Sequence, residues 1–85
     1  MIEKQNLAGW TVSELVAFFA REGIPRDAYA IYADADESYC LVREGNEWLV
    51  YYSERGNRNH LGWGETESQA LNILKLFVLE GCGRL

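Results

Sequence analysis

The sequence predicts an α+β domain in which a helix, three or four antiparallel strands and a second helix form a two-layer sandwich. Three observations indicate this. Apolar residues recur at helical spacing near both ends of the chain, and each of these segments follows a capping motif. Apolar and polar residues alternate between them, which is typical of strands. Finally, 85 residues suffice for one domain only. We therefore expect a single domain over residues 1–85, with residues 1–9 as a candidate loosely ordered segment.

The first helix is expected to begin at Thr11. Thr11 and Glu14 form a capping box, in which each side chain can accept a hydrogen bond from the main chain of the other residue. Gly23 predicts the end of the helix, because glycine readily adopts the left-handed conformation that follows a helix. The apolar face between these two points consists of Val12, Leu15, Val16, Phe18 and Phe19.

Four segments in the middle of the chain are predicted as strands. They are residues 28–32, 38–43, 47–53 and 58–63, of which the last has the weakest pattern. The turns at residues 44–47 and 54–57 are short, so we expect antiparallel neighbours. The third strand has apolar residues on both faces, which indicates a central position in the sheet.

The second helix is expected to begin after Thr66, where Thr66 and Gln69 repeat the capping motif, and to end at Gly81. It is apolar almost all round, because Leu71, Leu76 and Leu79 add to its main apolar face. Such a helix is either the main core helix or part of an interface.

Composition limits the classes of function. The net charge of −5, from 13 acidic and 8 basic residues, repels nucleic-acid phosphates and favours a cationic partner, unless it serves solubility alone. The chain has neither a membrane-spanning segment of about 20 apolar residues nor a secretion signal, so we expect a cytoplasmic protein without membrane association. Cys40 and Cys82 lack metal-binding spacing and are expected to be free thiols rather than a disulfide.

No catalytic, cofactor or metal site is expected. His60 has no nucleophile and orienting group around it in the sequence, so it is interpreted as a surface residue. The acidic loop at residues 34–37 lacks the glycine and distal glutamate of a calcium loop. The segment 62–64 is too sparse in glycine for a phosphate loop.

Basic and aromatic residues also occur together near the last two strands, a combination that can bind single-stranded nucleic acid. They are Arg55, Arg58, His60, Tyr51 and Trp63. Because the patch is small and the chain is acidic, we expect no direct nucleic-acid binding. The alternative is structural: Glu54 and Arg55 form a local salt bridge that fixes the turn, and the aromatic residues belong to the core.

The chain resembles the small immunity proteins of bacterial polymorphic-toxin and contact-dependent growth inhibition systems. The most specific part of the resemblance is Tyr-Tyr-Ser-Glu-Arg-Gly at residues 51–56, followed by the Thr-Glu-Ser-Gln-Ala start of the second helix. Residues 23–29 and 38–41 add to it, and it covers about residues 15–79. Trp63, with the glycines on either side, departs from the pattern.

The resemblance implies a non-enzymatic inhibitor that binds a cognate toxin domain, often a nuclease or a nucleotide-directed toxin, through an acidic surface. The free protein is then expected to be a monomer or a weak homodimer. Interface hot spots favour Tyr and Trp, which makes two aromatic residues candidate anchors. The candidate partner-binding residues are Asp34, Asp36, Glu37, Glu44, Glu47, Tyr52, Glu54 and Trp63.

Two alternatives remain. A regulatory or adaptor module would bind a different protein through the second apolar face of the last helix, at Leu76 and Leu79. A small enzyme would need His60 or the carboxylates in a cleft.

Overall fold

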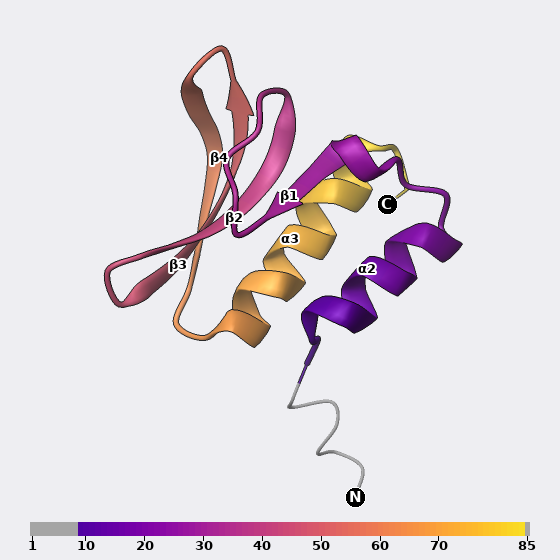
Figure 1. The fold of residues 1–85 in the computed structure, drawn as a ribbon, viewed down its shortest axis with the longest axis horizontal. Coiled ribbons are helices and arrows are strands. Elements are labelled where there is room, and N and C mark those ends of the chain that lie inside the picture. Colours follow the sequence, from indigo (N-terminus) through magenta and orange to yellow (C-terminus); the bar gives the residue numbers. More distant parts are fainter. Residues whose placement is uncertain (1–8, 85) are drawn as a thin grey trace, which may run out of the picture.

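The computed structural model describes residues 9–84, so the candidate loose segment at residues 1–9 lies almost entirely outside the described residues. The fold class is the predicted α+β arrangement, in which the strands follow the first helix and precede the last one along the chain (Figure 1). The elements are α2 (Val12–Arg21), the 3₁₀ helix η1 (Arg26–Ala28), β1 (Tyr29–Ile31), β2 (Ser38–Glu44), β3 (Glu47–Glu54), β4 (Asn57–Gly64) and α3 (Glu67–Gly81).

The four strands form one mixed sheet in the order β1-β2-β3-β4. The pairs β2–β3 and β3–β4 are antiparallel, as predicted, and β3 is central. The pair β1–β2 is parallel, with Tyr29 opposite Tyr39, where an antiparallel neighbour was expected. Because β1 has only three residues, the six residues of the loop at 32–37 are long enough to bring the chain back to the start of β2.

Both helices lie on the same side of the sheet (Figure 1). α3 packs against β2, β3 and β4, and α2 lies beside α3, where Phe19 contacts Tyr29 of β1 with ring centroids 4.6 Å apart. The main core lies between these layers. Its buried residues are Leu15, Phe19, Ile24, Tyr29, Leu41, Val50, Ala70, Leu71, Leu74, Val78 and Leu79.

Two glycines allow α3 to approach β4 closely. A Cβ atom on Gly62 would lie 2.9 Å from Cγ2 of Ile73, and one on Gly64 would lie 2.8 Å from the main-chain nitrogen of Ala70. Side chains in a strand alternate between faces, so Trp63 points away from α3. The Gly-Trp-Gly segment thus combines close helix packing on one face with an aromatic residue on the other.

The helix ends follow the local signals. At Thr11 both bonds of the capping box with Glu14 are present. At Thr66 the side chain accepts from the Gln69 N–H at 3.1 Å, but the Gln69 side chain accepts from the N–H of Glu65 instead of Thr66. α3 also extends through Gly81 to a cap at Cys82.

Candidate functional site

The face of the sheet opposite the helices, here called the open face, is not covered by any helix among residues 9–84 (Figure 1). Alternation and register place four rows of side chains on it. The rows are Ser38, Ser53 and Arg58; Cys40 and Tyr51; Val42, Leu49 and Trp63; and Glu44 with Glu47. The open face therefore has an apolar centre, with polar rows at both ends.

A second small core lies at the centre of the open face. Cys40 and Tyr51 are fully buried and Leu49 is 2% exposed, whereas Leu61 and Trp63 on the edge strand β4 are 52% and 55% exposed. On the open face, the apolar side chains of β2 and β3 are thus buried, whereas large apolar side chains of β4 are accessible. Accessible aromatic residues beside a buried centre are typical of protein-binding surfaces.

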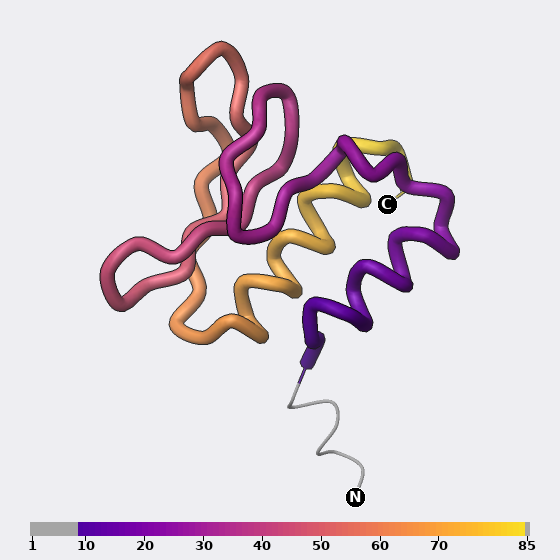
Figure 2. The backbone as a smooth tube through the Cα atoms, in the orientation of Figure 1, coloured from indigo at the N-terminus to yellow at the C-terminus, as the bar shows by residue number. Residues whose placement is uncertain are grey.

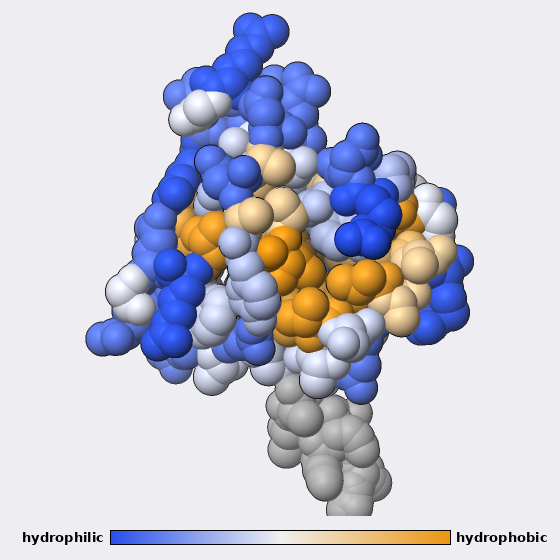
Figure 3. Space-filling view, viewed as in Figure 1, coloured by the Kyte–Doolittle hydropathy of each residue, from blue (hydrophilic) through white to orange (hydrophobic). Residues whose placement is uncertain are grey.

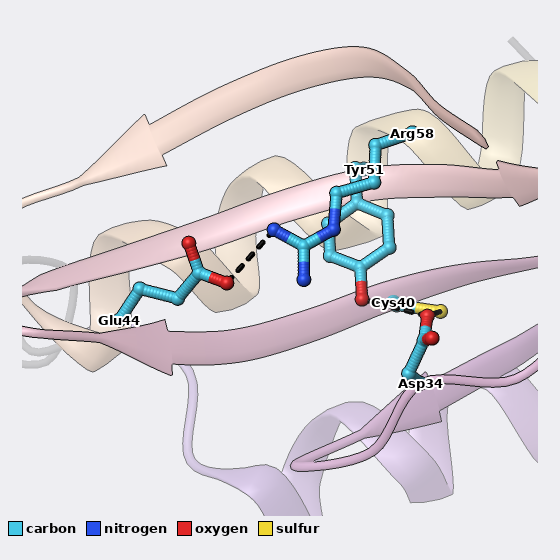
Figure 4. A network of polar contacts seen from close by, with 5 residues as sticks. All are labelled: Asp34, Cys40, Glu44, Tyr51 and Arg58. Atoms are coloured by element: carbon cyan, nitrogen blue, oxygen red, sulfur yellow. Dashed lines mark hydrogen bonds and ion pairs between the residues drawn. The ribbon is translucent and has the colours of Figure 1, made fainter. Parts of the chain in front are cut away.

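A polar network covers the buried centre (Figure 4). The Arg58 guanidinium lies 4.4 Å from the ring centroid of Tyr51 and forms an ion pair with Glu44 at 2.8 Å. The Tyr51 hydroxyl donates a hydrogen bond to Oδ1 of Asp34 at 2.8 Å. The network therefore connects β2, β3 and β4 to the loop between β1 and β2.

The network changes the acid–base properties of its members. Burial, and then the hydrogen bond with Asp34, raises the pKa of Tyr51 above its ordinary value. Burial also raises the pKa of the Cys40 thiol, whose sulfur lies among polar atoms of Asp34, Ala35 and Ser38. A buried thiol with a raised pKa is a poor nucleophile.

The acidic loop at residues 34–37 is fixed against the turn between β3 and β4. Asp36 Oδ1 accepts a hydrogen bond from the Arg55 N–H at 2.7 Å, and the Glu37 N–H donates to the Ser53 carbonyl at 2.7 Å. Figure 2 shows these two loops side by side at one end of the sheet. Glu54, at the end of β3, adds a further exposed carboxylate there.

The eight candidate partner-binding residues therefore fall into separate groups. Asp34, Asp36, Glu37 and Glu54 lie at the end of the sheet with the β1–β2 loop, here called the acidic end. Glu44 and Glu47 face each other across the β2–β3 hairpin, at another corner of the sheet (Figure 2). Trp63 lies on the open face, one row from these two glutamates.

Tyr52 lies on the opposite face from Trp63. It is half-buried on the helix side, where its ring centroid is 4.8 Å from that of Tyr39. The two candidate aromatic anchors thus cannot serve one flat interface on the open face.

The basic and aromatic residues near β4 do not form one patch. Arg58 stacks on Tyr51 on the open face, whereas the exposed His60 lies toward α3, with its ring centroid 6.2 Å from that of Phe77. A β-bulge at this point of β4 separates them. Trp63, expected in the core under the structural interpretation, is exposed instead.

The expected salt bridge between Glu54 and Arg55 is absent from the part of the chain that the structure describes. Arg55 and Gly56 instead both have positive φ, of 53° and 82°, as the central residues of tight hairpin turns commonly do. Backbone geometry and the bond from the Arg55 N–H to Asp36 therefore hold this turn.

In the sequence, Tyr51 and Arg58 stand out only as members of the basic and aromatic patch, and nothing marks Leu61 as a surface residue. The alternation along β3 places Leu49 and Tyr51 on the face away from Trp48. This pattern was the only sign in the sequence that Tyr51 belongs to the open face.

The stack of Arg58 on Tyr51 follows from the pairing of Arg58 with Ser53 beside the β3–β4 turn. The bulge beyond it, for which the sequence gives no clear sign, determines the faces on which His60 and Trp63 lie.

No helix within residues 9–84 has the length and apolar character needed to cross a membrane. Comparisons of the chain with protein-family models, with curated proteins and with solved structures found no match.

Proposed function

We propose that this domain is a cytoplasmic immunity protein that binds and neutralises a cognate bacterial toxin domain through its acidic end. One observation carries the proposal: Asp34, Asp36 and Glu37 lie in the loop between β1 and β2, beside Glu54 at the end of β3, and hydrogen bonds hold this loop against the rest of the domain. The resemblance of residues 51–56 and of the start of α3 to immunity proteins supports the class of partner.

Electrostatics gives the proposal its mechanism. Nucleases and nucleotide-directed toxins have basic active sites, because they must attract phosphate groups. An acidic surface on a protein of net charge −5 speeds association with such a site and favours the correct orientation of the two proteins. Because the acidic loop is already fixed, binding does not have to order it, which reduces the entropic cost of association. Inhibition then follows from occupation of the toxin surface, without catalysis by this domain.

The test uses the full chain and the toxin domain encoded by the neighbouring reading frame. Glu37→Lys and Glu54→Lys alter exposed carboxylates that form no ion pair within residues 9–84. We expect each to slow association severalfold at low salt, with a smaller effect at 150 mM salt, since salt screens charges at the surface. Stopped-flow association kinetics measures this, and co-expression with the toxin measures protection.

Glu80→Lys is the matched control. It makes the same change of charge at an exposed position on α3, outside the residues that form the acidic end. Equal association rates for Glu37→Lys, Glu54→Lys and Glu80→Lys would remove the acidic end from the proposal. Absence of any binding by the unmodified protein would remove the toxin partner.

A second candidate function is an adaptor module that binds a different protein through the helices. Apolar residues gather over α3 in the view of Figure 3, and Leu76 is 42% exposed. Leu79, expected on the same surface, is buried in the core. Leu76→Gln is therefore the informative variant: loss of self-association in light scattering would favour this surface, whereas unchanged self-association would count against it.

A further inference from the structure

Trp63 is a large apolar side chain held in an accessible position. Gly62 and Gly64 pack against α3, so the chain can present Trp63 only on the open face. It pairs with Leu49, which pairs in turn with Val42, so the indole belongs to an apolar row of the open face. Trp63 is 55% exposed. Because a tryptophan side chain has only two χ angles, it can bind a partner at little cost in side-chain entropy.

A carboxylate lies beside this ring. Glu47 is two residues before Leu49 on β3, so it shares the open face and is a diagonal neighbour of Trp63, within reach of a long side chain. It is exposed and forms no ion pair with any residue from 9 to 84. Its register partner Glu44 is already paired with Arg58.

The same face shows what an aromatic ring and a carboxylate do together. Arg58 places its guanidinium 4.4 Å from the centroid of Tyr51 and pairs with Glu44 at 2.8 Å. Trp63 and Glu47 present the same two kinds of group, and within residues 9–84 no cation lies on them. The indole of tryptophan is the side chain that attracts a cation most strongly through its ring face.

We propose that the protein partner inserts an arginine side chain over the indole of Trp63 and pairs it with Glu47. This inference rests on the proposed function, because it specifies the chemistry with which a cationic partner meets the open face. Arginine fits better than lysine, since its planar guanidinium stacks on an aromatic face and pairs with a carboxylate at the same time. The contact makes Trp63 the anchor of the interface, and the acidic end supplies the long-range attraction.

The first experiment needs no toxin. The full chain and its variants are titrated with a nona-arginine peptide and with a nona-lysine peptide. Isothermal titration calorimetry gives each affinity, and NMR follows the indole N–H resonance of Trp63 in the proteins that retain this residue. We expect nona-arginine to shift this resonance and to bind about tenfold more weakly to Trp63→Leu and to Glu47→Gln. Trp63→Phe keeps an aromatic ring, so its affinity for nona-arginine should fall by less. Nona-lysine should bind more weakly, with little difference between these variants.

Tyr32→Leu is the control for loss of an exposed ring, because Tyr32 is 59% exposed and contacts Trp48 on the helix side. Thermal unfolding of each variant confirms that it is folded. An unshifted Trp63 resonance, or nona-arginine affinities that are equal in the unmodified protein and Trp63→Leu, would overturn the inference.

The second experiment separates the inference from the proposed function. Association with the toxin domain is measured for Trp63→Leu and Glu47→Gln, and we expect faster dissociation, by about tenfold for Trp63→Leu. Toxin binding that both substitutions leave unchanged would refute the arginine contact while the proposed function stands. Arginine binding at Trp63 without any toxin binding would refute the proposed function and leave the contact.

Discussion

Tyr51 connects the core of the open face to the acidic loop. Its ring is buried under the Arg58 guanidinium, and its hydroxyl holds the carboxylate of Asp34. In the sequence, Tyr51 is one apolar position of a predicted strand. In the structure, it also orients Asp34, a candidate binding residue. The ring was predictable from alternation, but the two polar contacts were not, because both partners lie on other elements and are brought near only by the fold.

Tyr51→Phe should separate these two roles. The phenyl ring keeps the packing and the stack with Arg58, and only the hydrogen bond to Asp34 is lost. We expect the free energy of unfolding to fall by about 1–2 kcal/mol, since a buried hydroxyl bonded to a carboxylate is replaced by a C–H. Urea unfolding followed by circular dichroism measures this. Tyr52→Phe is the matched control, because the Tyr52 hydroxyl makes no hydrogen bond within residues 9–84, and an equal loss in both variants would contradict the prediction.

The Tyr51 hydroxyl, through its burial and its bond to Asp34, also makes a pH-dependent contribution to stability. The pKa of Tyr51 is raised in the folded state, so above about pH 10 the unfolded chain loses this proton while the folded protein retains it. The unfolded state then binds fewer protons, and stability falls as pH rises. We expect the free energy of unfolding to decrease more steeply between pH 9 and pH 11 in the unmodified protein than in Tyr51→Phe. Parallel slopes in urea melts across this range would show that Tyr51 does not contribute.

At the scale of elements, local signals predicted the fold better than they predicted the surface. The capping motifs at Thr11 and Thr66 and the tight turns identified both helices and both hairpins, since these signals act over a few residues. The parallel pairing of β1 depends on the length of β1 and of its loop together. The division of the acidic residues between two corners of the sheet depends on the register of all four strands.

The contact between α3 and β4 provides a graded test of element packing. A methyl group on Gly64 would meet main-chain atoms of Ala70 at 2.8 Å and Thr66 at 3.1 Å, which cannot move without disturbing the start of α3. A methyl group on Gly62 would meet side-chain atoms of Ile73 and Phe77, which can rotate or shift. We expect Gly64→Ala to cost about 3 kcal/mol or to prevent folding, and Gly62→Ala to cost about 1 kcal/mol. Urea unfolding ranks the two, and the reverse order would contradict this packing.

At the scale of the whole molecule, the sheet separates two environments. One side faces the helices and holds the main core, and the other forms the open face with its smaller core and its accessible edge strand. Packing against the helices fixes the positions of residues on the far side of the sheet, as Gly62 and Gly64 do for Trp63. A change in the core can therefore alter a binding surface that it does not touch.

The two cysteines report on these environments, because each lies on a different side of the sheet. Cys40 is fully buried in the core of the open face, whereas Cys82 is half-buried at the end of α3 and packs against the main core. Both are free thiols, as predicted. In the native protein we expect Ellman's reagent to label Cys82 readily and Cys40 only after unfolding, so that 8 M urea reveals a second thiol.

In Cys82→Ser the labelling rate of Cys40 should therefore measure global opening. Its logarithm should rise linearly with urea, with the slope obtained from equilibrium unfolding, because β2 lies inside the sheet and cannot open separately. Tyr51→Phe should speed this labelling by about five- to thirtyfold, the rate equivalent of about 1–2 kcal/mol. A labelling rate that is independent of urea would instead mean that the open face opens locally while the helices and the main core remain folded.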